Sequence, residues 1–354
     1  MLDVTRADLA PHTTLRLGGP AGRLVVASVQ DEILQIVRDG GRAGAPPLVL
    51  AGGSNVVIAD EGVPGTVLLL RTAGIRLDRA RDGEVLVTVE AGQDWDEVVA
   101  SAVAEGLVGI ECLSGVPGSA GATPIQNVGA YGQEVAETIT SVRVLDRARD
   151  AVCDMSPAEC RFAYRSSVFR HNDRYVVLAV TFRLRRGGAS APIRYAELAR
   201  ALGVAVGARV PLAEARAAVL ALRAGKGMVL DPSDPDTYSV GSFFVNPVLS
   251  PSAFASLRGR SVEIIDEEPA SWPADGGDVK VSAAWLIERA GFVKGYAGSH
   301  PGVSISTKHT LALTNRGTGT AAALIGLARE IRDGVAKAFD VELRPEPVLV
   351  GFAL

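Results

Sequence analysis

Apolar and polar positions alternate along the N-terminal fifth of the chain in a way that predicts both strands and a helix. Between Arg23 and Arg71, one helical pattern is flanked by apolar runs of strand length. The apolar runs are 24–27, 47–51 and 66–70, and the helical pattern is 31–37, with Ile33, Ile36 and Val37 on one face. This order predicts a small β-α-β-β unit.

A second series of elements begins near residue 74. Val85, Val87 and Val89 occupy alternate positions, as in a strand, and Asp94 is placed to cap a helix that stops at Gly106. The elements that follow are strands at 141–145 and 175–184, a loop at 186–192 and a helix at 213–223. The region from 74 to 226 therefore predicts a second α+β unit.

The run Asp231-Pro232-Ser233-Asp234-Pro235 cannot sustain a helix and marks a boundary. Beyond it, the best helical patterns are 282–290, which stops at Gly291, and 320–339. Leu324, Leu327, Ile331, Val335 and Phe339 recur at helical spacing in the second of them. A third unit is expected from 227 onward, which fits a chain of 354 residues, since one core rarely serves so many.

Composition and charge exclude several classes of function. The net charge of −4 and the lack of a long basic run give no reason to bind nucleic acid. No stretch reaches the roughly 18 apolar residues that a membrane helix needs, and residues 1–9 lack the apolar core of a signal peptide. The three cysteines, Cys112, Cys153 and Cys160, show no C-x-x-C spacing, so we expect reduced thiols in a cytoplasmic protein. We expect no obligate protein partner.

Two glycine-rich segments are candidates for binding a cofactor. Gly52-Gly53-Ser54-Asn55 follows an apolar run, and both a plain tight turn and a phosphate-contacting loop fit it. The longer segment, 114–132, carries glycines spaced G-x-x-G-x-x-G among Ser, Thr, Gln and Asn, which suits a cradle of backbone amides around a long ligand. It does not match the Rossmann turn, and Gly225-Lys226-Gly227 does not match a P-loop.

Six motifs in order resemble one family, the UDP-N-acetylenolpyruvoylglucosamine reductases or MurB flavoenzymes. The motifs are Thr13-Thr14-Leu15-Arg16-Leu17-Gly18-Gly19, Gly52-Gly53-Ser54-Asn55, Pro117-Gly118 through Pro124-Ile125-Gln126-Asn127-Val128-Gly129-Ala130-Tyr131-Gly132, Tyr164-Arg165-Ser166-Ser167-Val168-Phe169-Arg170, Gly241-Ser242-Phe243-Phe244-Val245-Asn246-Pro247 and Pro345-Glu346-Pro347. Together they span essentially the whole chain. Arg194-Tyr195-Ala196-Glu197-Leu198 further resembles the branch in which a loop tyrosine swings over the substrate.

The resemblance implies an α+β fold with a two-subdomain FAD-binding module of the vanillyl-alcohol-oxidase or PCMH type and a C-terminal α+β substrate-binding domain. The subdomains would be 1–73 and 74–226, and the substrate domain 227–345, with 346–354 packing back on the first subdomain. The implied FAD-binding residues are Gly52, Gly53, Ser54, Asn55, Pro117, Gly118, Ser119, Gly121, Ala122, Thr123, Gln126, Asn127, Gly129, Ala130 and Tyr131.

The activity that the resemblance implies is the reduction of an enolpyruvyl ether of UDP-N-acetylglucosamine by NADPH through FAD, in peptidoglycan synthesis. Arg165 would bind the substrate carboxylate with a rigid guanidinium, Ser242 would donate a proton to the α carbon, and Glu346 would act as a neutral hydrogen-bond donor to that carboxylate. Lys226 and Asn246 would lie near the substrate's diphosphate and the nicotinamide, and Tyr195 would cover the substrate.

The four histidines show no ligand spacing, so no metal is expected, although His309 is a candidate to approach the substrate. Two alternatives remain open at this point. One is an FAD-dependent oxidase of sugars or hydroxy acids, which the joint presence of Arg165, Ser242 and Glu346 disfavours. The other is a flavin-binding redox sensor, which would have no need to keep those residues.

Overall fold

The computed structural model describes residues 2–79 and 83–354 and divides the chain into two compact units. Unit 1 contains the first strand, Pro20–Gly53 and Val63–Val229. Unit 2 contains Leu9–Gly19, Ser54–Gly62 and Leu230–Leu354. Two short early segments thus belong with the C-terminal third of the chain.

Unit 1 begins with a mixed sheet that matches the predicted β-α-β-β unit. Its spatial order is β1 (Leu2–Asp8), β2 (Pro20–Ala27), β5 (Val63–Leu70) and β3 (Leu48–Leu50). β1 pairs antiparallel with β2, whereas β2 and β3 both run parallel to β5. The predicted helix is longer than expected, because α1 runs over Gln30–Arg42 and buries Ile33 and Val37.

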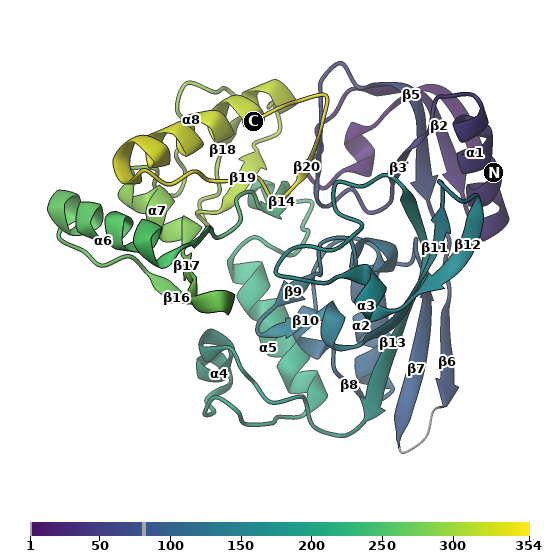
Figure 1. Ribbon diagram of the computed structural model, residues 1–354, viewed down its shortest axis with the longest axis horizontal. Coiled ribbons are helices and arrows are strands. Elements are labelled where there is room, and N and C mark those ends of the chain that lie inside the picture. The colour runs from purple at the N-terminus through teal and green to yellow at the C-terminus, as the bar shows by residue number, and fades with distance from the viewer. Residues whose placement is uncertain (1, 80–82) are drawn as a thin grey trace. The chain divides into compact units, whose positions relative to one another are not determined.

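The rest of unit 1 is organised around an antiparallel sheet (Figure 1). Its path is β12 (Ala151–Met155), β11 (Ile139–Asp146), β13 (Tyr175–Arg186), β7 (Glu84–Glu90) and β6 (Ile75–Arg79), and β8 (Leu107–Val108) also pairs with β13. α2 (Trp95–Ala104) packs its Trp95 ring 5.5 Å from that of Phe182 on β13. Asp94 caps α2 as predicted, because its carboxylate accepts from the Glu97 N–H at 3.0 Å.

Three helices and a short hairpin complete unit 1. α4 (Ala196–Leu202) and α5 (Leu212–Gly225) pack around a small core that includes Ile193, Leu198 and Val219. The hairpin pairs β9 (Gly129–Ala130) with β10 (Gln133–Glu134), and α3 (Pro157–Cys160) is a single turn. The predicted loop around Tyr195 is therefore partly wrong: Tyr195 precedes α4, and Ala196 to Leu198 are helical.

Unit 2 packs three small sheets against helices. The sheets are β14 (Ser239–Ser242), β19 (Ala312–Asn315) and β18 (Val303–Ile305); β15 (Val248–Leu249), β17 (Val279–Val281) and β16 (Ser271–Pro273); and the parallel pair β4 (Val56–Ile58) and β20 (Val348–Val350). The helices are α6 (Pro251–Ile265), α7 (Ala283–Arg289) and α8 (Ala321–Phe339). All five apolar positions predicted for α8 are buried.

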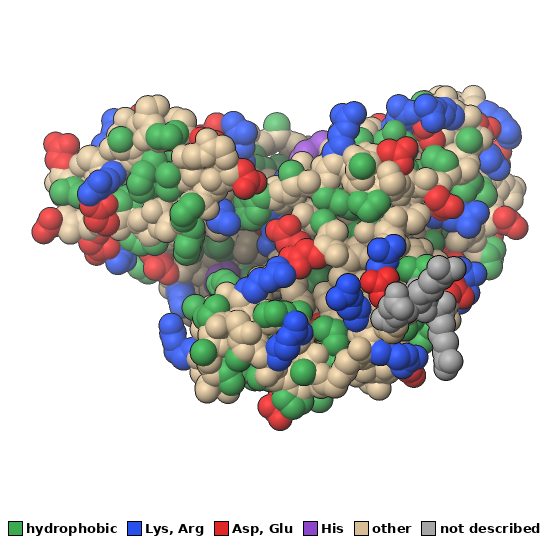
Figure 2. Space-filling view, turned by 60° about the horizontal axis from the view of Figure 1, so that its bottom comes forward, with side chains coloured by type: hydrophobic (Ala, Val, Ile, Leu, Met, Phe, Trp, Pro, Cys, Tyr) green, Lys and Arg blue, Asp and Glu red, His purple; other side chains and the backbone are tan. Residues whose placement is uncertain are grey.

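The visible surface carries charges of both signs, and the three cysteines are not paired with one another. Figure 2 shows Lys and Arg side chains interspersed with Asp and Glu over the visible face, consistent with 36 basic and 40 acidic residues. Among the described residues, no helix is long and apolar enough to cross a membrane. Cys112, Cys153 and Cys160 are free thiols, and burial raises the pKa of both Cys112 and Cys160 to about 12.

Candidate active site

The two glycine-rich segments meet backbone to backbone in unit 1. A Cβ atom added to Gly52 would lie 2.6 Å from the Gly118 Cα, and one added to Gly121 would lie 2.5 Å from the Ala91 Cβ. Gly53 and Gly118 also have positive φ values, of 60° and 129°. Glycine is therefore required here both for space and for conformation. We call the main-chain surface formed by Gly52, Gly53 and the segment 114–132 the glycine-rich wall.

Main-chain hydrogen bonds fix the longer segment to the start of α2. The Trp95 N–H donates to the Gly118 carbonyl at 3.1 Å, and the Gly121 N–H donates to the Ala91 carbonyl at 2.9 Å. Asp96 on α2 accepts from the Gly115 N–H at 2.6 Å and forms a bidentate pair with Arg216 on α5. Burial acts to raise the pKa of Asp96, but these hydrogen bonds outweigh it and hold the pKa below its ordinary value.

The polar inventory of this wall fits a cofactor such as FAD. The Ser119 hydroxyl is buried and has no hydrogen-bond partner within residues 2–79 and 83–354, which is the state expected of a group that binds an external acceptor or donor. Asn127 differs: its amide donates to Glu134 at 2.7 Å and accepts from the Ala136 N–H at 3.1 Å, so this side chain serves the internal structure. Thr123 likewise donates to the Ala120 carbonyl.

Arg165 stands at a tight turn that is attached to the same segment. Its φ is 50°, and Ala163 and Ser166 on either side form a β-bridge. The Arg165 Nη2 donates to the Gly129 carbonyl at 2.7 Å, and a Cβ on Gly129 would lie 3.0 Å from the Arg165 Nη1. The glycine thus allows the guanidinium to lie against the main chain, which fixes the plane of the fork.

Tyr131, Tyr195 and Lys226 come together at the end of the glycine-rich segment. The rings of Tyr131 and Tyr195 meet edge to face with centroids 5.5 Å apart, and the Lys226 Nζ lies 5.8 Å from the Tyr131 centroid. Lys226 also pairs with Glu197 at 2.6 Å. Burial raises the pKa of Tyr131 to about 12, so its hydroxyl is protonated at neutral pH.

Arg223 lies one turn before Lys226 and was not predicted from the sequence. Its Nη2 donates to the Met228 carbonyl at 2.9 Å, but its buried Nε has no hydrogen-bond partner in the part of the chain that the structure describes. Burial holds the pKa of Arg223 below its ordinary value. The sequence does not show that an arginine on an amphipathic helix will be buried, because its surroundings depend on tertiary packing.

In unit 2, Ser242 and Glu346 lie on hydrogen-bonded segments. Ser242 ends β14, Phe243 N–H donates to the Leu311 carbonyl at 2.7 Å, and the Glu346 N–H donates to the Phe243 carbonyl at 2.8 Å. Phe244 and Pro345 form a β-bridge beside them. The chain bends at Glu346 and Pro347.

Two early segments brace this part of unit 2. The Thr14 hydroxyl donates to the Ser239 carbonyl at 2.6 Å, so the motif near residue 13 is bonded to β14, the strand that ends at Ser242. The Asn55 amide approaches the Glu346 carbonyl at 3.5 Å, and the Val348 N–H donates to the Asn55 carbonyl at 3.0 Å. Ser54 and Asn55 thus belong to unit 2, whereas Gly52 and Gly53 belong to unit 1.

Asn246, predicted near the nicotinamide, has a structural contact. Its Oδ1 accepts from the Ala283 N–H at 2.9 Å, at the first residue of α7. This bond satisfies a main-chain donor that has no partner within the helix. The side chain therefore holds the segment after Ser242 against α7.

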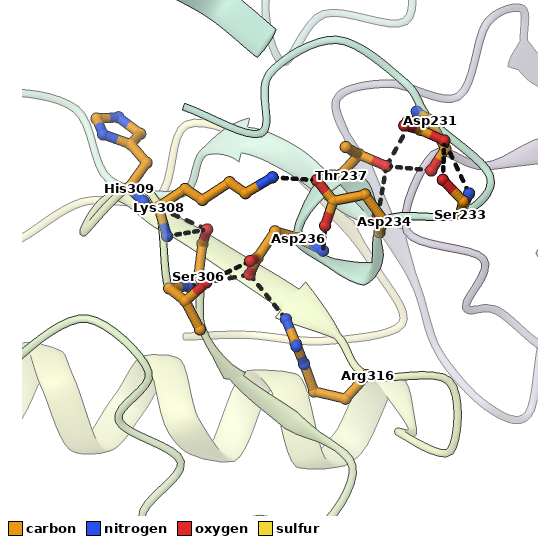
Figure 3. A network of polar contacts seen from close by, with 10 residues as sticks. Asp231, Ser233, Asp234, Asp236, Thr237, Ser306, Lys308, His309 and Arg316 are labelled. Atoms are coloured by element: carbon orange, nitrogen blue, oxygen red, sulfur yellow. Dashed lines mark hydrogen bonds and ion pairs between the residues drawn. The ribbon is translucent and has the colours of Figure 1, made fainter. Parts of the chain in front are cut away.

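A polar network joins the linker before β14 to the turn that carries His309 (Figure 3). Asp236 accepts from the Thr307 N–H at 3.0 Å and from Arg316 at 2.7 Å, and Lys308 pairs with Asp234 at 2.5 Å. Burial acts to raise the pKa of Asp236, but the bonds from Thr307 and the charge of Arg316 hold it below its ordinary value. No cluster of three or more potential metal ligands occurs among residues 2–79 and 83–354.

Comparison with known proteins defines the class. Residues 21–156 match the family model of an FAD binding domain, and residues 232–350 match that of the UDP-N-acetylenolpyruvoylglucosamine reductase C-terminal domain. The protein is therefore a flavoprotein oxidoreductase with an FAD-binding domain of the vanillyl-alcohol-oxidase type, as the sequence predicted.

Two relatives establish the family, and one solved structure shares the fold. The chain is 60% identical to the UDP-N-acetylenolpyruvoylglucosamine reductase of Salinispora arenicola, over 98% of this chain and 95% of that one, and 56% identical to that of Thermobifida fusca, over 98% and 97%. A crystal structure of the Thermus caldophilus reductase has the same fold, with a TM-score of 0.65 at 24% identity over 99% of this chain and 98% of that one. The chain belongs to the UDP-N-acetylenolpyruvoylglucosamine reductase family.

Proposed function

We propose that this protein reduces the enolpyruvyl ether UDP-N-acetyl-3-O-(1-carboxyvinyl)-glucosamine to UDP-N-acetylmuramate with NADPH, as a cytoplasmic step of peptidoglycan synthesis that serves cell-wall growth and cell division. The observation that carries the proposal is the 60% identity to a reductase of this name over nearly the full length of both chains. Within unit 1, the bond from Arg165 to the Gly129 carbonyl supports it, and within unit 2 the bond between the segments of Glu346 and Ser242 does so separately.

FAD would be held by the glycine-rich wall. At Gly52 and Gly121 any Cβ would collide with a neighbouring segment, Gly118 has a positive φ, and Ser119 supplies a buried hydroxyl without an internal partner among the described residues. When bound there, FAD supplies the chemistry of hydride transfer. The protein's own part is to bind the substrate, stabilise developing charge and deliver a proton.

Arg165 is proposed to bind the carboxylate of the enolpyruvyl group. Negative charge grows on that carboxylate as hydride adds to the β carbon, and a guanidinium can donate to both of its oxygens. The bond from Arg165 to the Gly129 carbonyl sets the orientation of the fork before substrate arrives. Such preorganisation is what makes a hydrogen-bond donor effective in a transition state.

Ser242 is proposed as the proton donor to the α carbon. A serine hydroxyl is a weak acid, so this role requires a strongly basic carbanion and a dry site. Phe243 and Phe244 directly follow Ser242, and their rings are buried with centroids 5.1 Å apart. These rings would exclude water from that side of the serine. Glu346, whose main chain is bonded to Phe243, would hold the substrate carboxylate as a neutral acid.

Lys226, Tyr195 and Asn246 are proposed to serve the substrate's diphosphate and the nicotinamide. The contacts of Tyr131 with both Tyr195 and Lys226 support a shared surface for the first two residues. We also propose that the chain belongs to the branch whose tyrosine segment covers the substrate. Asn246 is the weakest member of the set, because its Oδ1 already accepts from Ala283.

The three expected regions are proposed as functional subdivisions: FAD subdomains 1–73 and 74–226, and a substrate domain 227–345, with 346–354 returning to the first. Separate sheets in 2–70 and 75–186 support the first boundary. The pairing of β20 with β4 supports a return of the C-terminus to an early segment.

Anaerobic half-reactions test the proposed function. The bound flavin is reduced with NADPH, the enolpyruvyl UDP-sugar is added, and recovery of the oxidised flavin's absorption is followed. Recovery together with formation of the lactyl sugar is expected. A flavin that only oxygen reoxidises would favour an oxidase, and a protein without flavin would overturn the proposal.

A further inference from the structure

Lys226 is already paired with an acid of its own unit. Its Nζ lies 2.6 Å from the Glu197 Oε2, and the two side chains are 32% and 34% exposed. Glu197 stands in the first turn of α4, and Lys226 directly follows α5 (Figure 1). The ion pair is therefore reached by solvent, and an ion pair of this exposure exchanges its partners easily.

The same pair belongs to the surface that carries Tyr195. Tyr131 contacts both Tyr195 and Lys226, and a Cβ on Gly132 would lie 3.0 Å from the Arg194 Cβ. Arg194 is held in turn by Glu137 at 2.8 Å. The Tyr195 segment thus lies against the end of the glycine-rich wall, with Glu197 on the adjacent helical turn.

A diphosphate and the Glu197 carboxylate are competing ligands for one ammonium group. Each presents anionic oxygens, and Lys226 is a compact charge with three donors. A carboxylate that remains beside the ammonium repels an incoming phosphate group, because like charges at this distance interact unfavourably in a partly desolvated site.

We propose that Glu197 is an internal competitor for Lys226: it holds the ammonium over the Tyr131 ring when no diphosphate is present, and the diphosphate must displace it. This inference rests on the proposed function, in which Lys226 binds the substrate's diphosphate. Glu197 is a positioning residue that acts through Lys226. Its effect is to keep diphosphate ligands exchangeable, so that binding remains reversible on the time scale of turnover.

Binding of UDP to the flavin-loaded protein tests the proposal by titration calorimetry at low ionic strength. Glu197→Gln keeps the size and hydrogen-bonding capacity of the side chain and removes its charge, so UDP should bind about two- to fivefold more tightly, a gain of the size that exposed ion pairs contribute. The gain should shrink as salt is added. Glu214→Gln, which removes an exposed acid from the first turn of α5, is the matched control and should change nothing.

A double-mutant cycle separates this inference from the proposed function. Lys226→Ala should weaken UDP binding, and in that background Glu197→Gln should have no further effect. If Lys226→Ala binds UDP normally, the proposed role of Lys226 is wrong. If Lys226→Ala weakens UDP binding, the role of Lys226 stands. The role of Glu197 as a competitor is then overturned if Glu197→Gln does not tighten UDP binding, or if Glu214→Gln tightens it by the same factor.

Discussion

The main-chain N–H of Glu346 donates to the carbonyl of Phe243 at 2.8 Å, which links the segment of the proposed carboxylate-binding acid to the residue that follows Ser242. The two segments are about a hundred residues apart in the chain, and the sequence gives no direct sign that they pair. A β-bridge between Phe244 and Pro345 extends the contact. A substitution that moves either main-chain segment should therefore disturb both side chains.

Ser242→Ala should separate the two half-reactions. The flavin should still be bound and still be reduced by NADPH, whereas reoxidation by the enolpyruvyl sugar should slow by about two to four decades, as expected for loss of a positioned proton donor. Stopped-flow absorbance under anaerobic conditions measures both steps. Ser256→Ala, on the exposed side of α6, is the control and should behave as the unmodified protein. Normal reoxidation in Ser242→Ala would remove this residue from the mechanism.

Arg165→Lys should preserve charge but lose catalysis. An ammonium cannot reproduce the planar fork that the Gly129 carbonyl orients, so turnover should fall by about two to three decades. The same change at Arg143, which points to solvent from β11, provides the comparison and should have little effect. Steady-state rates with saturating substrate decide the matter, and equal rates in the two variants would contradict the proposed role.

Elements with strong local signals were predictable from the sequence. The buried stripe of α8 follows from its helical spacing, and the capping bond that Asp94 accepts from the Glu97 N–H follows from an acid placed before an apolar run. α6 was missed because its burial is slight: Leu257 and Ser261 are the buried members that the structure gives for this helix. A helix without a clear apolar face leaves little periodicity to detect.

The candidate site was predictable as a set of residue types, but the contacts within it were not. The glycines of the wall stand out in the sequence, whereas the role of each depends on a close approach such as that between Gly52 and Gly118. The amide groups of Asn127 and Asn246 look available in the sequence and have internal partners in the structure. Pairing of Glu197 with Lys226 depends on how α4 and α5 pack, which local patterns do not determine.

Gly52→Ala should reduce flavin content. The new Cβ would lie 2.6 Å from the Gly118 Cα, so one of the two main-chain segments must move away from the wall. Gly65→Ala is a matched control, because a Cβ there meets nothing within 4 Å. The ratio of flavin absorbance to protein in the purified variants gives the readout. Full flavin content in Gly52→Ala would mean that the approach of these two segments is not needed for binding.

Asp236→Asn should destabilise unit 2 in a manner that depends on pH. Because hydrogen bonds and Arg316 hold the folded-state pKa of Asp236 below its ordinary value, the ionised group stabilises the folded protein above about pH 4, and this contribution is lost as the pH falls through the folded-state pKa. The variant should lose about 1–3 kcal/mol of unfolding free energy at pH 7, the usual cost of weakening a buried hydrogen-bonded group.

The difference between Asp236→Asn and the unmodified protein should therefore begin to shrink as the pH falls below about 4, and it should be smallest below the folded-state pKa, where the native carboxyl is neutral as well. Denaturant unfolding at several pH values measures it, with Asp333→Asn as a control because that carboxylate is 65% exposed. A loss of stability that stays constant from pH 7 to pH 3 would show that size and shape at this position matter and that the charge does not.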